Sequence, residues 1–123
     1  MKIILIGILI LLSACADDRA VFNLEPLPPQ HQLTFAEAVA WWQTDDIRVD
    51  PWGTDQAVMG NLSPEFSAYA QSAGGRWTIT FNQSLAWTES LFCRFARHEL
   101  GHVLGLDHSA EPGNVMNPNP PPC

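Results

Sequence analysis

Three histidines and one glutamate stand close together near the carboxyl end of the chain, in the run HELGHVLGLDH. His98 and His102 are four residues apart, so on a helix they point the same way and can place two imidazole nitrogens on one metal ion. Glu99 lies one step round that helix, beside the metal without being forced to bind it. Gly105 can adopt the left-handed conformation that ends a helix, and the turned chain can then supply His108 as a third ligand. Three neutral imidazoles suit zinc and leave its fourth position for water, which is the arrangement of a catalytic site.

The helix that would carry these ligands is predicted to begin at Thr88 or Glu89 and to run to Leu104. The clearest strand covers residues 76–82, where apolar and polar residues alternate. Shorter strands are expected at residues 46–50 and 56–62.

A second helix is predicted farther upstream. Thr34 and Glu37 form a capping box, and apolar residues recur at helical spacing from there to about Gln43. Residues 16–32 hold three prolines and no sustained periodicity, so we expect them to form a flexible tether with His31 solvated within it.

The composition limits the kinds of partner. The chain of 123 residues carries six Lys and Arg against thirteen Asp and Glu, for a formal net charge of −7. Nucleic-acid binding draws most of its affinity from clustered basic residues, so a nucleic-acid partner is not expected. The length fits one domain, and we expect a monomer.

The amino end has the layout of an export signal. Lys2 is followed by an apolar run that ends at Leu12, which is too short to span a bilayer. The ending Leu12-Ser13-Ala14-Cys15 resembles the lipobox of bacterial lipoproteins. By that resemblance, residues 1–14 are a signal peptide that is removed, Cys15 is lipidated, and the anchor holds the protein in the bacterial cell envelope, with the outer membrane favoured by Ala16. The alternative is an ordinary signal that releases a soluble protein.

The histidine run also resembles a known enzyme family. His98, Glu99, His102, Gly105 and His108 occupy all the fixed positions of the metzincin zinc signature. The Met-turn of that group follows in the run NVMNP, which contains Met116. With a serine after the third histidine, HELGHVLGLDHS is most similar to the matrixins, and the runs RWTITFNQ and SLFCRFARHE resemble them too. The likeness covers roughly residues 33–118 and is specific from about residue 91.

The resemblance implies an α+β fold for residues 33–123, following a lipidated tether at residues 15–32. In this small metzincin-like zincin domain, a twisted and mostly parallel sheet packs on two helices, and a Met-turn follows the active-site helix. Met116 would form an apolar floor beneath the imidazoles. The strand at residues 77–82 would line a cleft in which a peptide lies extended.

Two departures from the family pattern bear on the site. Matrixins usually bind a second, structural zinc through further histidines, and here only His31 remains, so one catalytic zinc is expected and a structural zinc is not. The segment after the Met-turn lacks the family's closing helix, and a disulfide between Cys93 and Cys123 could take its place. The alternative is two unpaired thiols.

These residues predict a zinc endopeptidase that acts on peptide or protein substrates and is held at the membrane through Cys15. Glu99 would take a proton from the attacking water and later deliver it to the leaving amine, and zinc would polarise the scissile carbonyl. The alternative is a surface lipoprotein in which zinc only stabilises a peptide-binding or protein-binding module.

Overall fold

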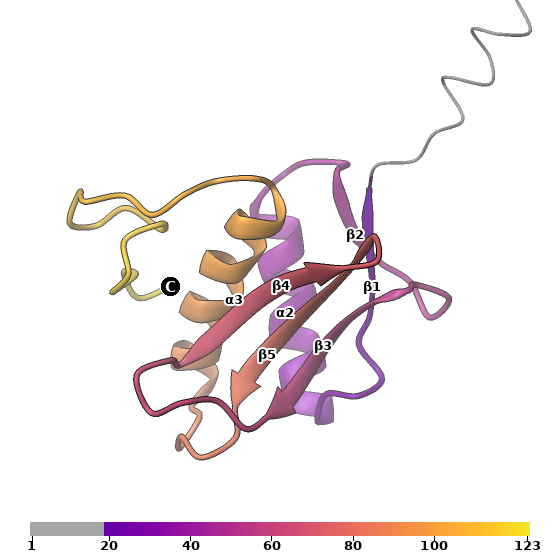
Figure 1. Ribbon diagram of the computed structural model, residues 1–123, viewed down its shortest axis with the longest axis horizontal. Coiled ribbons are helices and arrows are strands. Elements are labelled where there is room, and N and C mark those ends of the chain that lie inside the picture. The colour runs from indigo at the N-terminus through magenta and orange to yellow at the C-terminus, as the bar shows by residue number, and fades with distance from the viewer. Residues whose placement is uncertain (1–18) are drawn as a thin grey trace, which may run out of the picture.

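The computed structural model describes residues 19–123, in which a five-stranded sheet packs against two helices (Figure 1). The strands run in the order β2-β1-β3-β5-β4, and every neighbouring pair is parallel except β4 and β5. The predicted α+β class, with its mostly parallel sheet on two helices, is confirmed. The predicted signal peptide and the predicted lipidation site at Cys15 lie outside the described residues. The elements are β1 (Ala20–Asn23), α2 (Pro29–Trp41), β2 (Ile47–Val49), β3 (Asp55–Gly60), β4 (Ala68–Ala73), β5 (Arg76–Asn82) and α3 (Glu89–Val103).

The predicted flexible tether over residues 16–32 is wrong from Ala20 onward. Residues 20–23 form β1, which pairs with both β2 and β3 and therefore lies inside the sheet. Phe22 in this strand is fully buried, and Leu27 in the connection that follows is 3% exposed. The residues of β1, AVFN, are three apolar residues in a row and one polar residue, so they show no alternation from which a strand could be predicted. The folded domain thus begins near residue 20 rather than at residue 33.

The first helix begins five residues earlier than its predicted capping box. Pro29 opens α2, where a missing backbone N–H costs nothing because the first helical N–H groups have no partner within the helix. Thr34 therefore lies inside the helix, and its hydroxyl donates to the Gln30 carbonyl at 3.2 Å and contacts Glu89 of α3. The capping box at this position is wrong.

His31 is buried, which corrects its expected place in a solvated tether. Its side chain is only 7% exposed, and its ring stacks on Phe92 with the centroids 4.2 Å apart. Its Nδ1 lies 3.1 Å from a carboxylate oxygen of Glu89. His31, the histidine that is not part of the run HELGHVLGLDH, thus connects the first turn of α2 to the first turn of α3.

The core lies between the sheet and the helices. Aromatic rings from all the layers meet there: Phe22 of β1 packs on Phe35 of α2, and Phe81 of β5 stacks on Phe92 of α3 with the ring centroids 4.1 Å apart. All four side chains are fully buried. Both helices cover the same face of the sheet, and the C-terminal segment returns beside α3 (Figure 1).

A buried carboxylate ties three strands together. Asp55, at the start of β3, is 5% exposed, and its two oxygens accept hydrogen bonds from the backbone N–H groups of Val21 and Trp77, each at 2.7 Å. Val21 belongs to β1 and Trp77 to β5, so one side chain supplies partners to the strands on both sides of its own. These bonds satisfy backbone donors at the point where the ladders of β3 with β1 and with β5 begin.

A disulfide joins Cys93 of α3 to Cys123 at the end of the chain, and their Cα atoms are 6.2 Å apart. The bond spans 30 residues in sequence, and closing a loop of that size contributes about 3–4 kcal/mol to stability on the entropic model. Arg94, next to Cys93, donates to the side chain of Asn119 at 3.0 Å and also holds the tail against α3.

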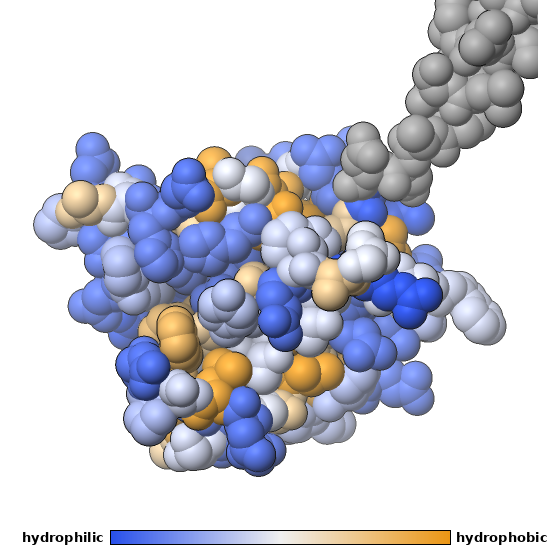
Figure 2. Space-filling view, viewed as in Figure 1, coloured by the Kyte–Doolittle hydropathy of each residue, from blue (hydrophilic) through white to orange (hydrophobic). Residues whose placement is uncertain are grey.

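Polar and apolar side chains are interspersed on the face of the domain that Figure 2 shows. On the face shown in Figure 2, apolar side chains form small groups that polar side chains separate. Within residues 19–123, neither helix combines the length and the hydropathy that a membrane span requires.

Candidate active site

The three histidines are positioned by one helix and the turn that ends it. Thr88 caps the start of α3 by accepting a hydrogen bond from the Leu91 N–H at 3.1 Å. At the other end, Gly105 has a φ of 90°, its N–H donates to the His102 carbonyl, and the Leu106 N–H donates to the Gly101 carbonyl. This pair of bonds is a Schellman motif, which reverses the chain after a helix. It carries His108 back beside the helix.

The reversal brings the three imidazoles together at one point. The Nε2 atom of His98 lies 3.2 Å from that of His102 and 3.3 Å from that of His108. The candidate ligand atoms of all three residues lie within 4.8 Å of one another. The spacing in the sequence thus predicted a cluster that the fold does assemble.

Backbone carbonyls orient two of these rings. Val115 accepts from Nδ1 of His98 at 2.8 Å, and Leu106 accepts from Nδ1 of His102 at 2.9 Å. Because a carbonyl only accepts, Nδ1 must carry the hydrogen, and a neutral ring then has its lone pair on Nε2. Burial is the largest cause that lowers the pKa of His98, and the neighbouring His102 and His108 lower it too, against a raising effect of the Val115 hydrogen bond. A lowered pKa keeps the imidazole neutral and able to bind a metal.

The cluster fits a zinc ion. Zinc binds imidazole nitrogen at about 2.0–2.1 Å, so neighbouring ligands of a tetrahedral ion lie about 3.3 Å apart. The distances from Nε2 of His98 to Nε2 of His102 and of His108, 3.2 Å and 3.3 Å, agree with this value. His98 is buried, His102 is half-buried and His108 is exposed, so the group opens toward solvent on one side.

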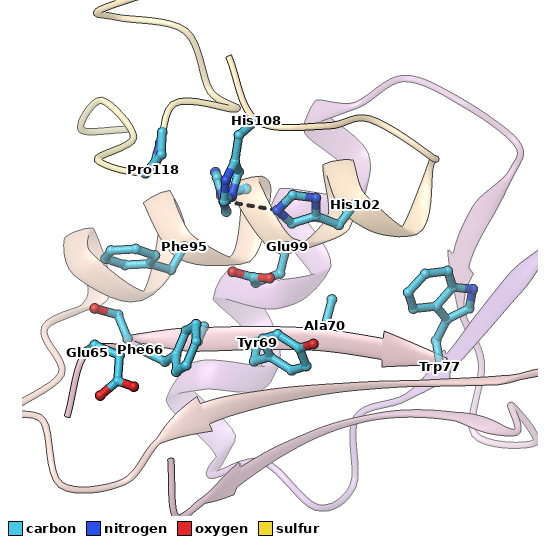
Figure 3. Close-up of a pocket in the computed structure, with 13 residues that line it drawn as sticks. Glu65, Phe66, Tyr69, Ala70, Trp77, Phe95, Glu99, His102, His108 and Pro118 are labelled. Atoms are coloured by element: carbon cyan, nitrogen blue, oxygen red, sulfur yellow. Dashed lines mark hydrogen bonds between the residues drawn. The ribbon is translucent and has the colours of Figure 1, made fainter. Parts of the chain in front are cut away.

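Glu99 lies between the histidines and the sheet. It is 5% exposed, and its carboxylate points from α3 toward β4 (Figure 3). Burial raises the pKa of Glu99 to about 7, and a hydrogen bond with the backbone of Ala70 acts in the opposite direction. The carboxyl group is therefore held beside the cluster in surroundings that favour binding a proton.

Met116 packs behind the helix that carries the ligands. It is 4% exposed, and its sulfur lies so close to Gly101 that a Cβ at that position would collide with it. Its backbone is held by Asn114, whose side chain accepts from the Met116 N–H at 2.8 Å, and by Ser109, whose N–H donates to the Met116 carbonyl at 2.9 Å. Met116 thus joins the segment after His108 to α3, at a residue between the two helical ligands.

The histidines and Glu99 open into a cavity of about 460 Å³ between α3 and β4. One wall comes from β4 and the loop before it, and the other comes from α3 and Pro118 of the C-terminal segment (Figure 3). The lining residues are Glu65, Phe66, Ser67, Ala68, Tyr69, Ala70, Trp77, Phe95, His98, Glu99, His102, His108 and Pro118.

The strand along this cavity is not the one predicted. β5 pairs with both β3 and β4 and therefore lies inside the sheet, and only Trp77 of that strand reaches the cavity. The edge strand β4, with Tyr69 and Ala70, forms the wall instead. Its sequence, AYAQSA, has three alanines and no large aliphatic residue, and apolar and polar residues do not alternate along it, so β4 lacked the pattern that marks a strand. The turn signal Gly74-Gly75 that joins β4 to β5 was the available clue.

Comparison with known proteins agrees with the geometry. A search of curated proteins found no significant match to the chain. The model of one protein family, described as Matrixin, matches residues 29–121, which include both helices, β2 to β5 and the histidine cluster. The match covers well over half of the chain. The chain therefore belongs to the matrixin family, a family of zinc metallopeptidases.

Proposed function

We propose that this chain is a zinc-dependent endopeptidase. The proposal is carried by one observation: the three imidazoles lie within reach of one metal ion, and the buried carboxylate of Glu99 lines the same open cavity. His98, His102 and His108 would hold the ion. When bound, zinc supplies a Lewis acid that polarises a carbonyl and lowers the pKa of water.

Glu99 acts as the general base and acid of this proposal. Its carboxylate accepts a proton from the water whose oxygen bonds to the peptide carbonyl carbon, and it later donates that proton to the amine nitrogen as the C–N bond breaks. Its position on the cavity wall, with one hydrogen bond to Ala70, keeps it within the space that a substrate would enter.

The substrate is proposed to lie extended along β4. This strand pairs only with β5 among the described strands, so its outer edge is available for hydrogen bonds to a peptide backbone. Phe66, Tyr69 and Phe95 add aromatic surface beside this edge, which suits an extended chain with apolar side chains.

Incubation of the folded protein with a mixed peptide library tests the proposed activity. We expect internal cleavage that a zinc chelator abolishes and that added zinc restores, measured by mass spectrometry of the products. A control digestion of a library made from D-amino acids should remain uncut. Zinc-loaded protein that binds peptides but cleaves none would instead support a binding module and would contradict the enzyme.

Membrane attachment is a second part of the proposal. The lipobox-like run ending at Cys15 favours lipidation in a bacterial envelope, with the outer membrane favoured by Ala16. Because β1 begins at Ala20, five peptide steps of at most about 3.5 Å would separate the lipidated residue from the sheet. We expect the mass of the membrane-extracted protein to show cleavage before Cys15 and added acyl chains, and Cys15→Ser to abolish both. An unacylated product released into the medium would contradict this attachment.

A further inference from the structure

One rim of the cavity is a loop rather than a regular element. Residues 61–67 connect β3 to β4, and Glu65, Phe66 and Ser67 of this loop line the cavity. The ring of Phe66 meets that of Tyr69 edge to face, with the centroids 5.6 Å apart (Figure 3). Phe66 and Tyr69 are 42% and 45% exposed, so the pair is open to a bound peptide.

This loop is held from beneath by one buried side chain. Asn82, the last residue of β5, is 1% exposed. Its Nδ2 donates to the Phe66 carbonyl at 3.0 Å and lies 3.4 Å and 3.5 Å from the carbonyl oxygens of Leu62 and Ser63. Three carbonyl oxygens from the loop thus converge on one amide group.

The other polar groups of Asn82 are also occupied. Its Oδ1 accepts from the Ser84 N–H at 3.1 Å and from the Ser84 hydroxyl at 2.7 Å, and its backbone N–H donates to the Ser67 carbonyl at 2.9 Å. Its carbonyl accepts from Nε1 of Trp87 at 2.8 Å. These bonds fix the amide in one orientation, with the NH₂ group toward the loop.

We propose that Asn82 is a positioning residue for substrate binding: its side-chain NH₂ group gathers the carbonyls of Leu62, Ser63 and Phe66 and so sets Phe66 against Tyr69 on the rim of the cleft. Asn82 itself lies outside the lining of the cavity and acts through the loop. The inference rests on the proposed peptidase function for its kinetic part, and on the structure alone for the arrangement of the loop.

The substitution Asn82→Asp tests the role with little change of volume. The carboxylate keeps an oxygen for Ser84 but presents a second oxygen, in place of the donor, to the carbonyls of Leu62, Ser63 and Phe66. Acceptors that face one another repel, so the loop should move. We expect the KM for a cleaved peptide to rise about tenfold, while kcat and the zinc content stay near those of the parent protein. Gln83→Ser is the matched control, because it removes the exposed hydrogen bond from Gln83 to Asn61, the first residue of the same loop, and leaves the contacts of Asn82 in place.

A spectroscopic measurement separates a moved loop from general damage. Tyr69 is the single tyrosine of the chain, so fluorotyrosine labelling gives one ¹⁹F resonance at the rim. We expect Asn82→Asp to shift this resonance and Gln83→Ser to leave it in place. Phe66→Ala should raise the KM by itself, and combining it with Asn82→Asp should add little, because both act through the same ring.

The results distinguish a failure of the role of Asn82 from a failure of the proposed peptidase function. An unshifted Tyr69 resonance with an unchanged KM, or an equal loss of kcat and bound zinc, would overturn the role of Asn82. If Asn82→Asp does not fold, Asn82→Ser shortens the side chain and removes the Nδ2 amide group without adding charge, and it carries the same expectations. If the parent protein cleaves no peptide, the proposed function fails, while the ¹⁹F result still decides whether Asn82 sets the loop.

Discussion

Glu99→Ala is expected to bind zinc and to lose hydrolysis. The three ligating imidazoles remain in place, but the group that takes and returns the proton is gone, and such groups contribute about 10²-fold to 10⁴-fold to the rate. The fold should survive, because a carboxylate that is only 5% exposed costs free energy to desolvate and its removal relieves that cost. The measurements are kcat/KM with a cleaved peptide, zinc per protein, and the thermal unfolding midpoint.

Two further variants, one conservative and one a control, make this test specific to the carboxylate of Glu99. Glu99→Gln keeps the shape of the side chain and an oxygen for the Ala70 backbone but cannot take the proton, so it should be as inactive as Glu99→Ala. Glu37→Ala removes an exposed carboxylate of α2 that does not line the cavity, and it should keep the parent activity. Hydrolysis at the parent rate by Glu99→Gln would remove Glu99 from the mechanism.

His102→Ala is expected to lose both zinc and activity. Removing one of three nitrogens leaves two protein ligands, which is fewer than catalytic zinc sites use. The stabilisation that bound zinc supplies disappears with it, amounting to about 4 kcal/mol when free zinc is a thousandfold above its dissociation constant. Metal analysis after gel filtration and unfolding curves recorded with and without zinc measure the two effects.

His31→Gln is the matched control, because His31 is the remaining histidine and lies at the far end of the helix pair. It should bind zinc at the parent ratio even if its lost packing on Phe92 lowers the unfolding midpoint. Stoichiometric zinc in His102→Ala would show that the ion is held by another set of ligands, and the proposed site would then be wrong.

The site was more predictable from sequence than the sheet around it. His98, Glu99 and His102 lie on one helix, so the 3.6-residue period alone places them, and Gly105 marks the turn that returns His108. Such local geometry needs no knowledge of the rest of the chain. The helix α3 and the strand β5 were likewise predicted within one residue of their observed bounds, because each has a long and regular pattern.

The strands β1 and β4 could not be predicted from the sequence, because contacts with residues elsewhere in the chain determine their place in the sheet. β1 is buried by pairing with β2 and β3, whose residues lie more than twenty positions later, and nothing within AVFN shows this. β4 is an edge strand of alanines, polar residues and one tyrosine without regular alternation, so its place beside Glu99 follows only from its pairing with β5. The sequence allowed either a disulfide between Cys93 and Cys123 or two unpaired thiols. The choice depends on whether the C-terminal segment returns to α3, which the sequence does not show.

The bond between Cys93 and Cys123 encloses every residue to which we assign a part in the chemistry. His98, Glu99, His102, His108 and Met116 all lie within one covalent ring. The proposed peptidase activity would expose the chain to attack by its own copies, and the solvent-exposed stretch 105–108 is a natural place for such a nick. A nick there would open the ring into two arms that stay joined through sulfur, so the third histidine would remain attached to the helix that holds the other two.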